Sequence, residues 1–213
     1  MTADGRLVAK AAELIADDAQ VQARPAHPWV GRGALKLIHA LDLWPITVSG
    51  RVVLDVGAST GGFTQVCLAR GAARVYAVDV GRAQMHPNVL ADPRVVSLEA
   101  TDARDLTLAL IPEPPGLIVA DVSFISLAKA MPAALALAAP GADLVALVKP
   151  QFEVGHGNVG KGGVVTDAAA RAGTLEAIKA FVAASGWSVR GSADSPIEGG
   201  DGNREYLLWA TKP

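Results

Sequence analysis

Two carboxylates and two lysines stand where a protein could move a proton. Asp121 ends the apolar run "GLIVADV", and Lys149 ends the apolar run "ADLVALVK". A charge at the end of so apolar a strand is costly unless it is paired. Lys36, in "GALKLIHALDLW", and Glu205, in "GNREYLL", add one more charge of each sign. These four side chains are the candidate catalytic residues.

A glycine-rich turn follows the first apolar run. In "RVVLDVGASTGGF", Asp55 and Gly57 are followed by Gly61 and Gly62. Glycines at such a turn let the backbone approach a ligand at the carboxyl end of a strand. The spacing is not the dinucleotide fingerprint G-x-G-x-x-G, so we expect a ligand without pyrophosphate.

Two more aspartates follow the next two apolar runs. Asp79 can accept a hydrogen bond from both ribose hydroxyls of a nucleoside, and Asp102 can accept from an exocyclic amine such as that of adenine. Together with the glycine turn they indicate adenosine with a small tail that carries no phosphate, which is S-adenosylmethionine. The predicted cofactor-binding residues are Asp55, Gly57, Ala58, Ser59, Gly61, Gly62, Phe63, Asp79, Asp102 and Ala103.

Short apolar runs alternate with helical patterns along most of the chain. The runs begin at residues 51, 74, 94, 116 and 142. Near-continuous apolar strands that alternate with helices predict a parallel sheet covered on both faces, which is a doubly wound, Rossmann-like α/β fold. Residues 187–197 and 204–212 form a closing strand pair with a short connection, which requires an antiparallel pairing. We therefore expect a mostly parallel, seven-stranded sheet with an antiparallel last strand.

Four helices are predicted between and around these strands. They span residues 33–44, 61–71, 126–141 and about 167–185. Pro132 leaves room for a kink in the third, and Thr166 or Asp167 can cap the fourth, which Gly186 ends. Residues 1–24 differ, since they hold two short extended pieces around a turn, too little to bury a core.

Composition and charge narrow the class of protein. The chain has 213 residues, about half of them apolar, so it can bury a full core. Its net charge of -2 gives no global basic field for nucleic acid. One cysteine, Cys67, suits a reducing compartment, and no signal peptide or uninterrupted membrane span is evident. The four histidines show no metal-ligand spacing. We expect a cytoplasmic protein without a metal, and the oligomeric state is left open.

A set of motifs resembles one known family. The motifs are "VGRGALKL", "LDVGASTGGFT", "ARVYAVDVG", "ADVSFISL", "ALVKPQFE", "VGKGGVV" and "GNREYLL", in order over residues 30–210. They resemble the TlyA family of ribosomal RNA 2′-O-methyltransferases, also called hemolysins, whose catalytic domain is of the RrmJ/FtsJ type. The resemblance implies a class I S-adenosylmethionine-dependent methyltransferase that acts on ribosomal RNA or ribosomal subunits, at cytidine 2′-hydroxyls. It also implies a Lys-Asp-Lys-Glu tetrad, which falls on Lys36, Asp121, Lys149 and Glu205.

The chemistry of methyl transfer suits these residue types. A ribose 2′-hydroxyl is a very weak acid, so its proton must leave or be polarised as the new bond forms. Burial and a neighbouring cation both help a lysine to accept a proton. We expect Lys149 to be the proton acceptor and Lys36 the neighbouring cation, with Asp121 and Glu205 orienting the two ammonium groups.

The same resemblance predicts the domain organisation. The family carries a small RNA-binding domain of the ribosomal-protein-S-four type before the catalytic domain. Residues 1–24 are interpreted as a remnant of that domain and residues 25–213 as the methyltransferase domain. We expect the missing part to precede this sequence, and to hold most of the affinity for RNA phosphates.

Other interpretations compete with this one. Residues 155–161 spell G-x-x-x-x-G-K, but Gly162 stands where a phosphate-binding loop needs Ser or Thr, so the spacing is taken as coincidence. The loop is instead expected to be a flap, with Lys161 available to an RNA phosphate. A small-molecule methyltransferase is the main alternative. A membrane-active hemolysin and a non-catalytic RNA-binding module fit less well, because no spanning segment or basic field is present.

Overall fold

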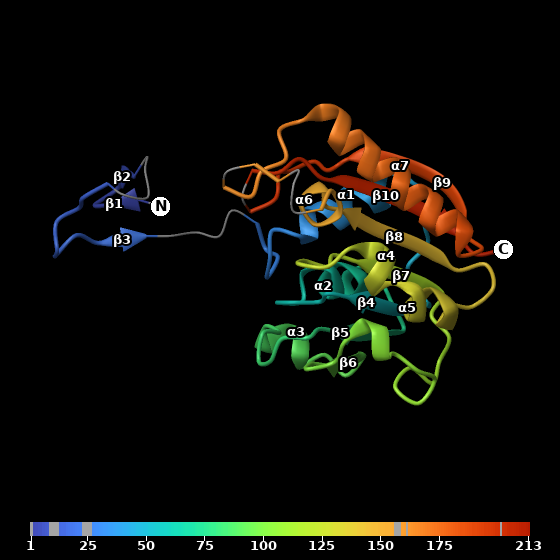
Figure 1. Cartoon of the computed structure of the whole chain (residues 1–213). Helices are drawn as coiled ribbons and strands as arrows, with labels where there is room; N and C mark the ends of the chain where they lie inside the picture. Colours follow the sequence, from blue (N-terminus) through green and yellow to red (C-terminus); the bar gives the residue numbers. More distant parts are fainter. Residues whose placement is uncertain (1, 9–12, 23–26, 156–158, 161, 201) are drawn as a thin grey trace.

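A seven-stranded sheet forms the centre of the protein (Figure 1). The computed structural model describes residues 2–8, 13–22, 27–155, 159–160, 162–200 and 202–213. The sheet has the strand order β6-β5-β4-β7-β8-β10-β9. The strands are β4 (Val52–Val56), β5 (Arg74–Val78), β6 (Val95–Leu98), β7 (Leu117–Ala120), β8 (Asp143–Val148), β9 (Ser188–Asp194) and β10 (Tyr206–Thr211).

The pairing of the strands confirms the predicted topology. The pairs β4/β5, β4/β7, β5/β6 and β7/β8 are parallel, whereas β10 is antiparallel to both of its neighbours, β8 and β9. Each parallel strand returns to the sheet through a crossover, as parallel pairing requires. The strand order reverses between β4 and β7, which is where ligands of open α/β sheets bind.

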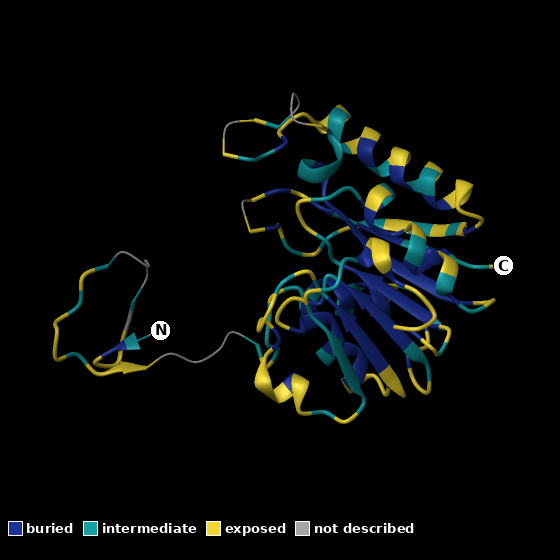
Figure 2. Ribbon diagram, turned by 60° about the horizontal axis from the view of Figure 1, so that its bottom comes forward, coloured by how far each residue is buried: buried dark blue, intermediate teal, exposed yellow. Residues whose placement is uncertain are grey.

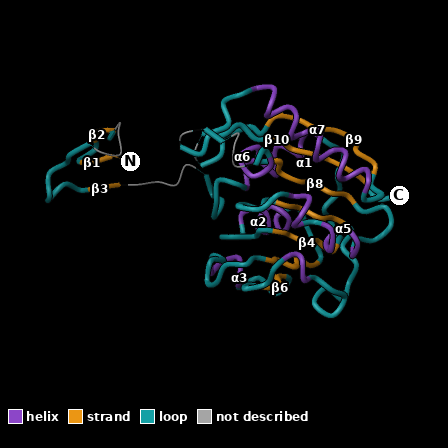
Figure 3. The backbone as a smooth tube through the Cα atoms, viewed as in Figure 1, coloured by secondary structure: helices purple, strands orange, loops and turns teal. Residues whose placement is uncertain are grey.

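Helices fill the crossovers, close to the predicted ranges (Figure 3). Asp167 caps the longest helix, α7, through hydrogen bonds from the amides of Ala169 and Ala170. The helix predicted over residues 126–141 is two helices, because the break before Pro132 is complete and the second helix already ends at Leu137. The helices are α1 (Ala34–Leu43), α2 (Gly62–Ala69), α3 (Pro87–Leu90), α4 (Leu127–Ala130), α5 (Pro132–Leu137), α6 (Pro150–Glu153) and α7 (Ala168–Ala184).

Alternate residues of the strands enter two separate cores, one on each face of the sheet. Leu54 and Val56 of β4 pack with apolar residues of α4, α5 and α7. Val53, between them, packs on the opposite face with residues of α1 and α2. The central strands are therefore buried throughout, whereas α7 alternates buried and exposed positions (Figure 2). This is the doubly wound α/β fold expected from the sequence.

A small separate sheet lies at the start of the chain. It has three strands, β1 (Thr2–Ala3), β2 (Arg6–Leu7) and β3 (Val21–Gln22), in the order β2-β1-β3. The sequence predicted two extended pieces, and the third strand is added where β3 returns antiparallel to β1. In the part of the chain that the structure describes, we find no helix with the length and apolar character needed to cross a membrane.

Strand register brings the ends of three elements to one edge of the sheet. Lys149 directly follows β8, whose last residue Val148 is paired with Tyr206, the first residue of β10. Glu205 precedes Tyr206 and therefore lies at the same edge as Lys149. Asp121 follows β7, and β7 is the parallel neighbour of β8. The carboxyl edge of the sheet thus gathers three of the four candidate catalytic residues.

The opposite edge of the sheet depends on one buried carboxylate. Asp143, the first residue of β8, accepts hydrogen bonds from Arg51 Nη1 at 2.6 Å and from Trp209 Nε1 at 2.8 Å. Trp209 also stacks on Trp44, with ring centroids 5.8 Å apart. Removing the carboxylate would leave two donors without their acceptor in a largely buried place.

We therefore expect Asp143→Ala to lower the free energy of unfolding by about 2 kcal/mol, measured by urea denaturation. Asp42→Ala is the matched control, because Asp42 also pairs with an arginine, Arg70, at 2.6 Å, but its side chain is 59% exposed. That control should lose less than about 1 kcal/mol. Equal losses in the two variants would contradict the assignment.

Candidate active site

A cavity of about 470 Å³ opens at the carboxyl edge of the sheet, beside β4, β5 and β7. Its volume is in the range of small-molecule sites. Polar groups on its wall include Ser59, Asp79, Asp102, Asp121 and Ser123. The wall also contains the predicted residues Gly57 and Ala103. This is the place where the sequence predicted a cofactor.

A second, smaller hollow of about 220 Å³ adjoins the first. The two share Gly57, Ser59, Asp121 and Ser123 in their walls, so these residues form their common border. Lys149 lies in the wall of the second hollow only. The predicted residues Ala58, Gly62 and Phe63 also line this second hollow rather than the larger one. A group held at Asp121 and Ser123 can therefore face ligands in both.

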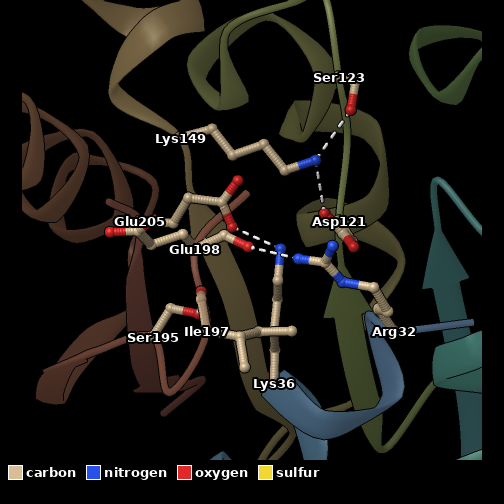
Figure 4. Close-up of polar contacts among 9 residues, drawn as sticks. All are labelled: Arg32, Lys36, Asp121, Ser123, Lys149, Ser195, Ile197, Glu198 and Glu205. Atoms are coloured by element: carbon tan, nitrogen blue, oxygen red, sulfur yellow. Dashed lines mark hydrogen bonds and ion pairs between the residues drawn. The ribbon is translucent and has the colours of Figure 1, made fainter. Parts of the chain in front are cut away.

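Two ion pairs with buried lysines lie at this end of the sheet, and one of them, Lys149–Asp121, lines the second hollow. Lys149 Nζ lies 2.6 Å from Asp121 Oδ1, and Lys36 Nζ lies 2.5 Å from Glu205 Oε2. Lys36 is only 7% exposed and Lys149 only 9%. Figure 4 shows Lys36 extending upward from α1 and Lys149 crossing above it, each with its nitrogen beside its carboxylate. The structure thus brings all four predicted catalytic residues into one cluster.

Ser123 is part of this cluster, and the sequence reasoning did not find it. Its hydroxyl oxygen accepts a hydrogen bond from Lys149 Nζ at 2.8 Å. The ammonium of Lys149 therefore has two oxygen partners, Asp121 and Ser123, which fix its nitrogen at the junction of the two hollows. The signal was available, because Ser123 stands two residues after Asp121 in "ADVSFISL".

Asp55 lies beneath the cavity and is not part of its wall. It is fully buried on the α2 side of β4, where its Oδ2 accepts a hydrogen bond from Thr64 Oγ1 at 2.6 Å. Its Oδ1 is buried without a hydrogen-bond partner in the described part of the chain. Burial raises the pKa of Asp55 from 3.8 to about 7, against the hydrogen bond from Thr64, and the charges of Asp121 and Asp79 add to the rise.

The other two predicted aspartates already have partners. Asp79 accepts the amide of Ser59 on one oxygen, at 2.8 Å, and the amide of Gly81 on the other, at 2.7 Å. Asp102 accepts from the backbone and the guanidinium of Arg104, and these hydrogen bonds lower the pKa of Asp102 to about 2. Both carboxylates still border the cavity. The partner of Asp102 is a feature that the sequence analysis missed.

The glycines of the turn also allow close packing of the backbone. Gly57 has a φ of 83°, and a Cβ at this position would lie 2.8 Å from the carbonyl oxygen of Asp121. Gly61, at the start of α2, has a φ of 90°, and a Cβ at this position would likewise crowd the side chain of Val89. The absence of a side chain at Gly57 therefore allows β4 and the end of β7 to approach, which brings Asp121 to the cavity.

Phe124 is a second residue that sequence reasoning missed. It lies in the cavity wall and yet is 91% exposed, with a φ of 65°. A left-handed backbone is unusual for a bulky residue and costs about 1 kcal/mol or more. The Phe124 ring is 5.2 Å from the ring of Phe152, whose face lies 6.0 Å from Lys149 Nζ. An aromatic ring is therefore held out at the mouth of the site.

Some predictions fall outside the described residues. Residues 156–158 and Lys161 of the flap predicted over residues 155–163 are among them. Within the described ranges, no group of three His, Cys, Asp or Glu side chains is arranged to hold a metal ion.

Comparison with known proteins identifies the family. A family model described as FtsJ-like methyltransferase matches residues 29–212. The chain is 53% identical to the 16S/23S rRNA (cytidine-2′-O)-methyltransferase TlyA of Mycobacterium tuberculosis over 181 residues, which cover 85% of this chain and 68% of that protein. It is 38% identical to hemolysin A of Brachyspira hyodysenteriae over 205 residues, covering 96% and 85%. The chain therefore belongs to the FtsJ-like methyltransferase family, and the resemblance to TlyA proteins is confirmed.

Solved structures agree with this result. A crystal structure of a protein named as a hemolysin from Lactococcus lactis is 40% identical, with a TM-score of 0.84 over 87% of this chain and 89% of that one. An S-adenosylmethionine-dependent methyltransferase from Mesorhizobium loti is 14% identical, with a TM-score of 0.62 over 84% of this chain and 99% of that one. The second likeness shows the fold alone.

The burial of Asp55 predicts a pH dependence of stability. Since its pKa is 3.8 when exposed and about 7 in the fold, folding binds a proton between these values. The contribution of the Asp55 carboxyl to the free energy of unfolding is present at about pH 4 and is lost as the pH rises to about 7. The difference of about three pKa units corresponds to an upper figure of about 4 kcal/mol.

Asp55→Asn should remove this dependence, because an amide keeps the acceptor for Thr64 and carries no charge. Urea denaturation between about pH 4 and pH 8 should show the variant gaining stability over the wild-type protein as the pH rises. Asp42→Asn, at an exposed ion pair, should show no such trend. A wild-type-minus-variant difference that is flat with pH would refute the assignment.

Proposed function

We propose that this protein transfers the methyl group of S-adenosylmethionine to a ribose 2′-hydroxyl of ribosomal RNA. The observation that carries the proposal is a pair of lysines, each more than nine-tenths buried and each held by its own carboxylate, of which the Lys149–Asp121 pair lines a hollow that adjoins the larger cavity. An alkoxide-forming step needs such buried cations and bases, and simple binding of RNA does not. The relatives named as ribosomal RNA methyltransferases support the substrate class.

The residues around the larger cavity fit the proposed cofactor. Asp79, at the end of β5, is positioned for the ribose hydroxyls, and Asp102 with Ala103 is positioned for the adenine ring. Gly57 and Ser59 leave room for the amino acid tail near Asp121. The cofactor would supply a methyl group on a positively charged sulfur. Asp55 would not contact the cofactor, but would support the glycine turn from beneath.

Lys149 is the proposed proton acceptor. In its neutral amine form it would take the 2′-hydroxyl proton as the oxygen–carbon bond forms and the sulfur–carbon bond breaks. Asp121 and Ser123 hold its nitrogen between the two hollows, which is the position that such a transfer requires. Lys36, held by Glu205, would then favour the developing negative charge on the ribose oxygen.

Phe124 supplies a surface for a base. An exposed aromatic ring can stack on an unpaired nucleobase, and this stacking is worth about 1–3 kcal/mol. The strained, exposed position of Phe124 beside Lys149 and Phe152 suits a nucleotide whose ribose enters the second hollow. Residues 1–24, interpreted as part of an RNA-binding domain, would add contacts to the RNA backbone.

Lys149→Ala should lower methyl transfer from labelled S-adenosylmethionine to ribosomal subunits by about 10²-fold or more, because the acceptor of the proton is lost. Binding of the cofactor, measured by calorimetry, should change little. Lys179→Ala is the control, since Lys179 pairs with Glu176 on the surface of α7. Normal turnover in Lys149→Ala would exclude this lysine as the acceptor, and label in small molecules alone would favour the alternative substrate class.

Phe124→Ala should raise the KM for the RNA substrate about tenfold while the KM for the cofactor stays close to that of the wild-type enzyme. Leu108→Ala gives a control at another exposed apolar side chain, away from the cavity wall. If both KM values rise together, Phe124 shapes the cofactor cavity instead of receiving a base.

A further inference from the structure

Asn203 is fully buried two residues before Glu205, and both ends of its side chain are used. Its Oδ1 accepts the amide of Val165 at 3.0 Å, and its Nδ2 donates to the carbonyl oxygen of Gly163 at 2.9 Å. The side-chain amide of Asn203 thus joins the segment that follows α6 to the segment that leads into β10. Its two hydrogen bonds have the donor and acceptor pattern of a backbone peptide in a strand pair. A buried amide satisfied at both ends holds its partners in a single arrangement.

Backbone hydrogen bonds close the loop that carries Glu205. The carbonyl oxygen of Asn203 accepts the amide of Gly199 at 2.9 Å, and the carbonyl oxygen of Glu205 accepts the amide of Ser195 at 2.9 Å. A Cβ at Gly199 would lie 2.5 Å from Glu205 Oε1. The carboxylate therefore packs against the backbone of this loop, and the shape of the loop sets its place.

The other side of the Asn203 bridge is anchored to a long helix. Arg171, in the first turn of α7, donates through Nη1 to the carbonyl oxygens of Val165, at 3.1 Å, and Thr166, at 3.0 Å. Val165 itself is buried. Through Asn203, the loop around Glu205 is thus fastened to α7, which packs on β8, β9 and β10.

A third contact joins the same loop to the element that carries Lys36. Arg32 Nη2 donates to the carbonyl oxygen of Glu198 at 3.0 Å (Figure 4). Arg32 lies just before α1, which holds Lys36. The Lys36–Glu205 ion pair is therefore enclosed by a loop that is fixed from both sides, and Asn203 is its buried attachment.

We propose that Asn203 is a positioning residue for methyl transfer, which acts by holding Glu205 against Lys36. The inference rests on the proposed function, in which Lys36 must face the ribose oxygen. It predicts an effect on the chemical step and on the loop, and little effect on the cofactor cavity, whose wall contains neither Asn203 nor Glu205.

The first test compares Asn203→Ala with Asn203→Asp. The alanine variant loses both hydrogen bonds. The aspartate variant keeps the acceptor for Val165 but sets a buried carboxylate oxygen against the carbonyl oxygen of Gly163. We expect kcat to fall about tenfold or more in both variants, with the dissociation constant of S-adenosylmethionine within about twofold of wild type. Asn88→Ala, at an exposed asparagine of α3, is the control and should leave both values unchanged.

A double-mutant cycle with Glu205→Gln separates positioning from general destabilisation. If Asn203 acts through Glu205, Asn203→Ala should lower kcat far less in the Glu205→Gln background than in the wild-type protein. Equal losses in both backgrounds would overturn the proposal. An unimpaired Glu205→Gln enzyme would instead count against the proposed function of the tetrad, so the two failures can be told apart.

Amide hydrogen exchange gives a readout that needs no catalysis. In Asn203→Ala or Asn203→Asp, the amides of Val165 and Ser195 should exchange about tenfold faster or more, while amides of β4 and β5 keep their protection. Faster exchange at Val165 with an unchanged Ser195 would mean that the bridge does not reach Glu205. Unchanged exchange at both amides would overturn the inference as well.

Discussion

A lysine ammonium that is removed from water must meet a carboxylate, and this requirement organises the active site. Lys36 and Lys149 are both more than nine-tenths buried. A single unpaired charge at such a depth costs several kcal/mol, so each lysine needs a partner delivered by another part of the fold. Asp121 comes from the end of β7 and Glu205 from the start of β10. The pairing stabilises both buried lysine side chains, and it holds that of Lys149 in the wall of the smaller hollow.

The topology of the sheet is what makes both pairings reachable. Parallel strands put their carboxyl ends at one edge, which suffices for Asp121 and Lys149. Glu205, however, precedes its strand, and it reaches the same edge only because β10 runs antiparallel to β8. A seventh strand in parallel orientation would place Glu205 at the far edge, beside Asp143. The reversed strand is thus a structural requirement of the Lys36–Glu205 pair as well as a consequence of the short β9–β10 connection.

Strands, crossovers and the strand-end residues Asp121 and Lys149 could be predicted because each leaves a local mark in the sequence, whereas Lys36 and Glu205 were joined to them through the family resemblance. The apolar runs of β4, β7 and β8 end visibly at the residue that carries the charge or just before it. What the sequence did not reveal depends on contacts across the fold. The burial of Asp55 is set by α2, and the ring of Phe124 is exposed because of its backbone conformation. The hydrogen bond between Asp102 and Arg104, by contrast, was local enough to be foreseen, as was the place of Ser123 two residues after Asp121.

The glycines of the motifs are explained by the same carboxylates. The glycine turn was predicted to admit a ligand, and a Cβ at Gly57 would also meet the backbone of Asp121. A Cβ at Gly33 would lie 3.2 Å from Asp121 Oδ2, and a Cβ at Gly199 would lie 2.5 Å from Glu205 Oε1. A carboxylate can reach a buried lysine only if the backbone beside it takes up little space. Glycines far apart in the sequence therefore share a packing role, which is to let two acidic side chains approach the two buried lysines. By this argument the glycines nearest to the chemistry are those packed against Asp121 and Glu205, and the glycine-lysine spacing after β8 needs no phosphate-binding role to explain it.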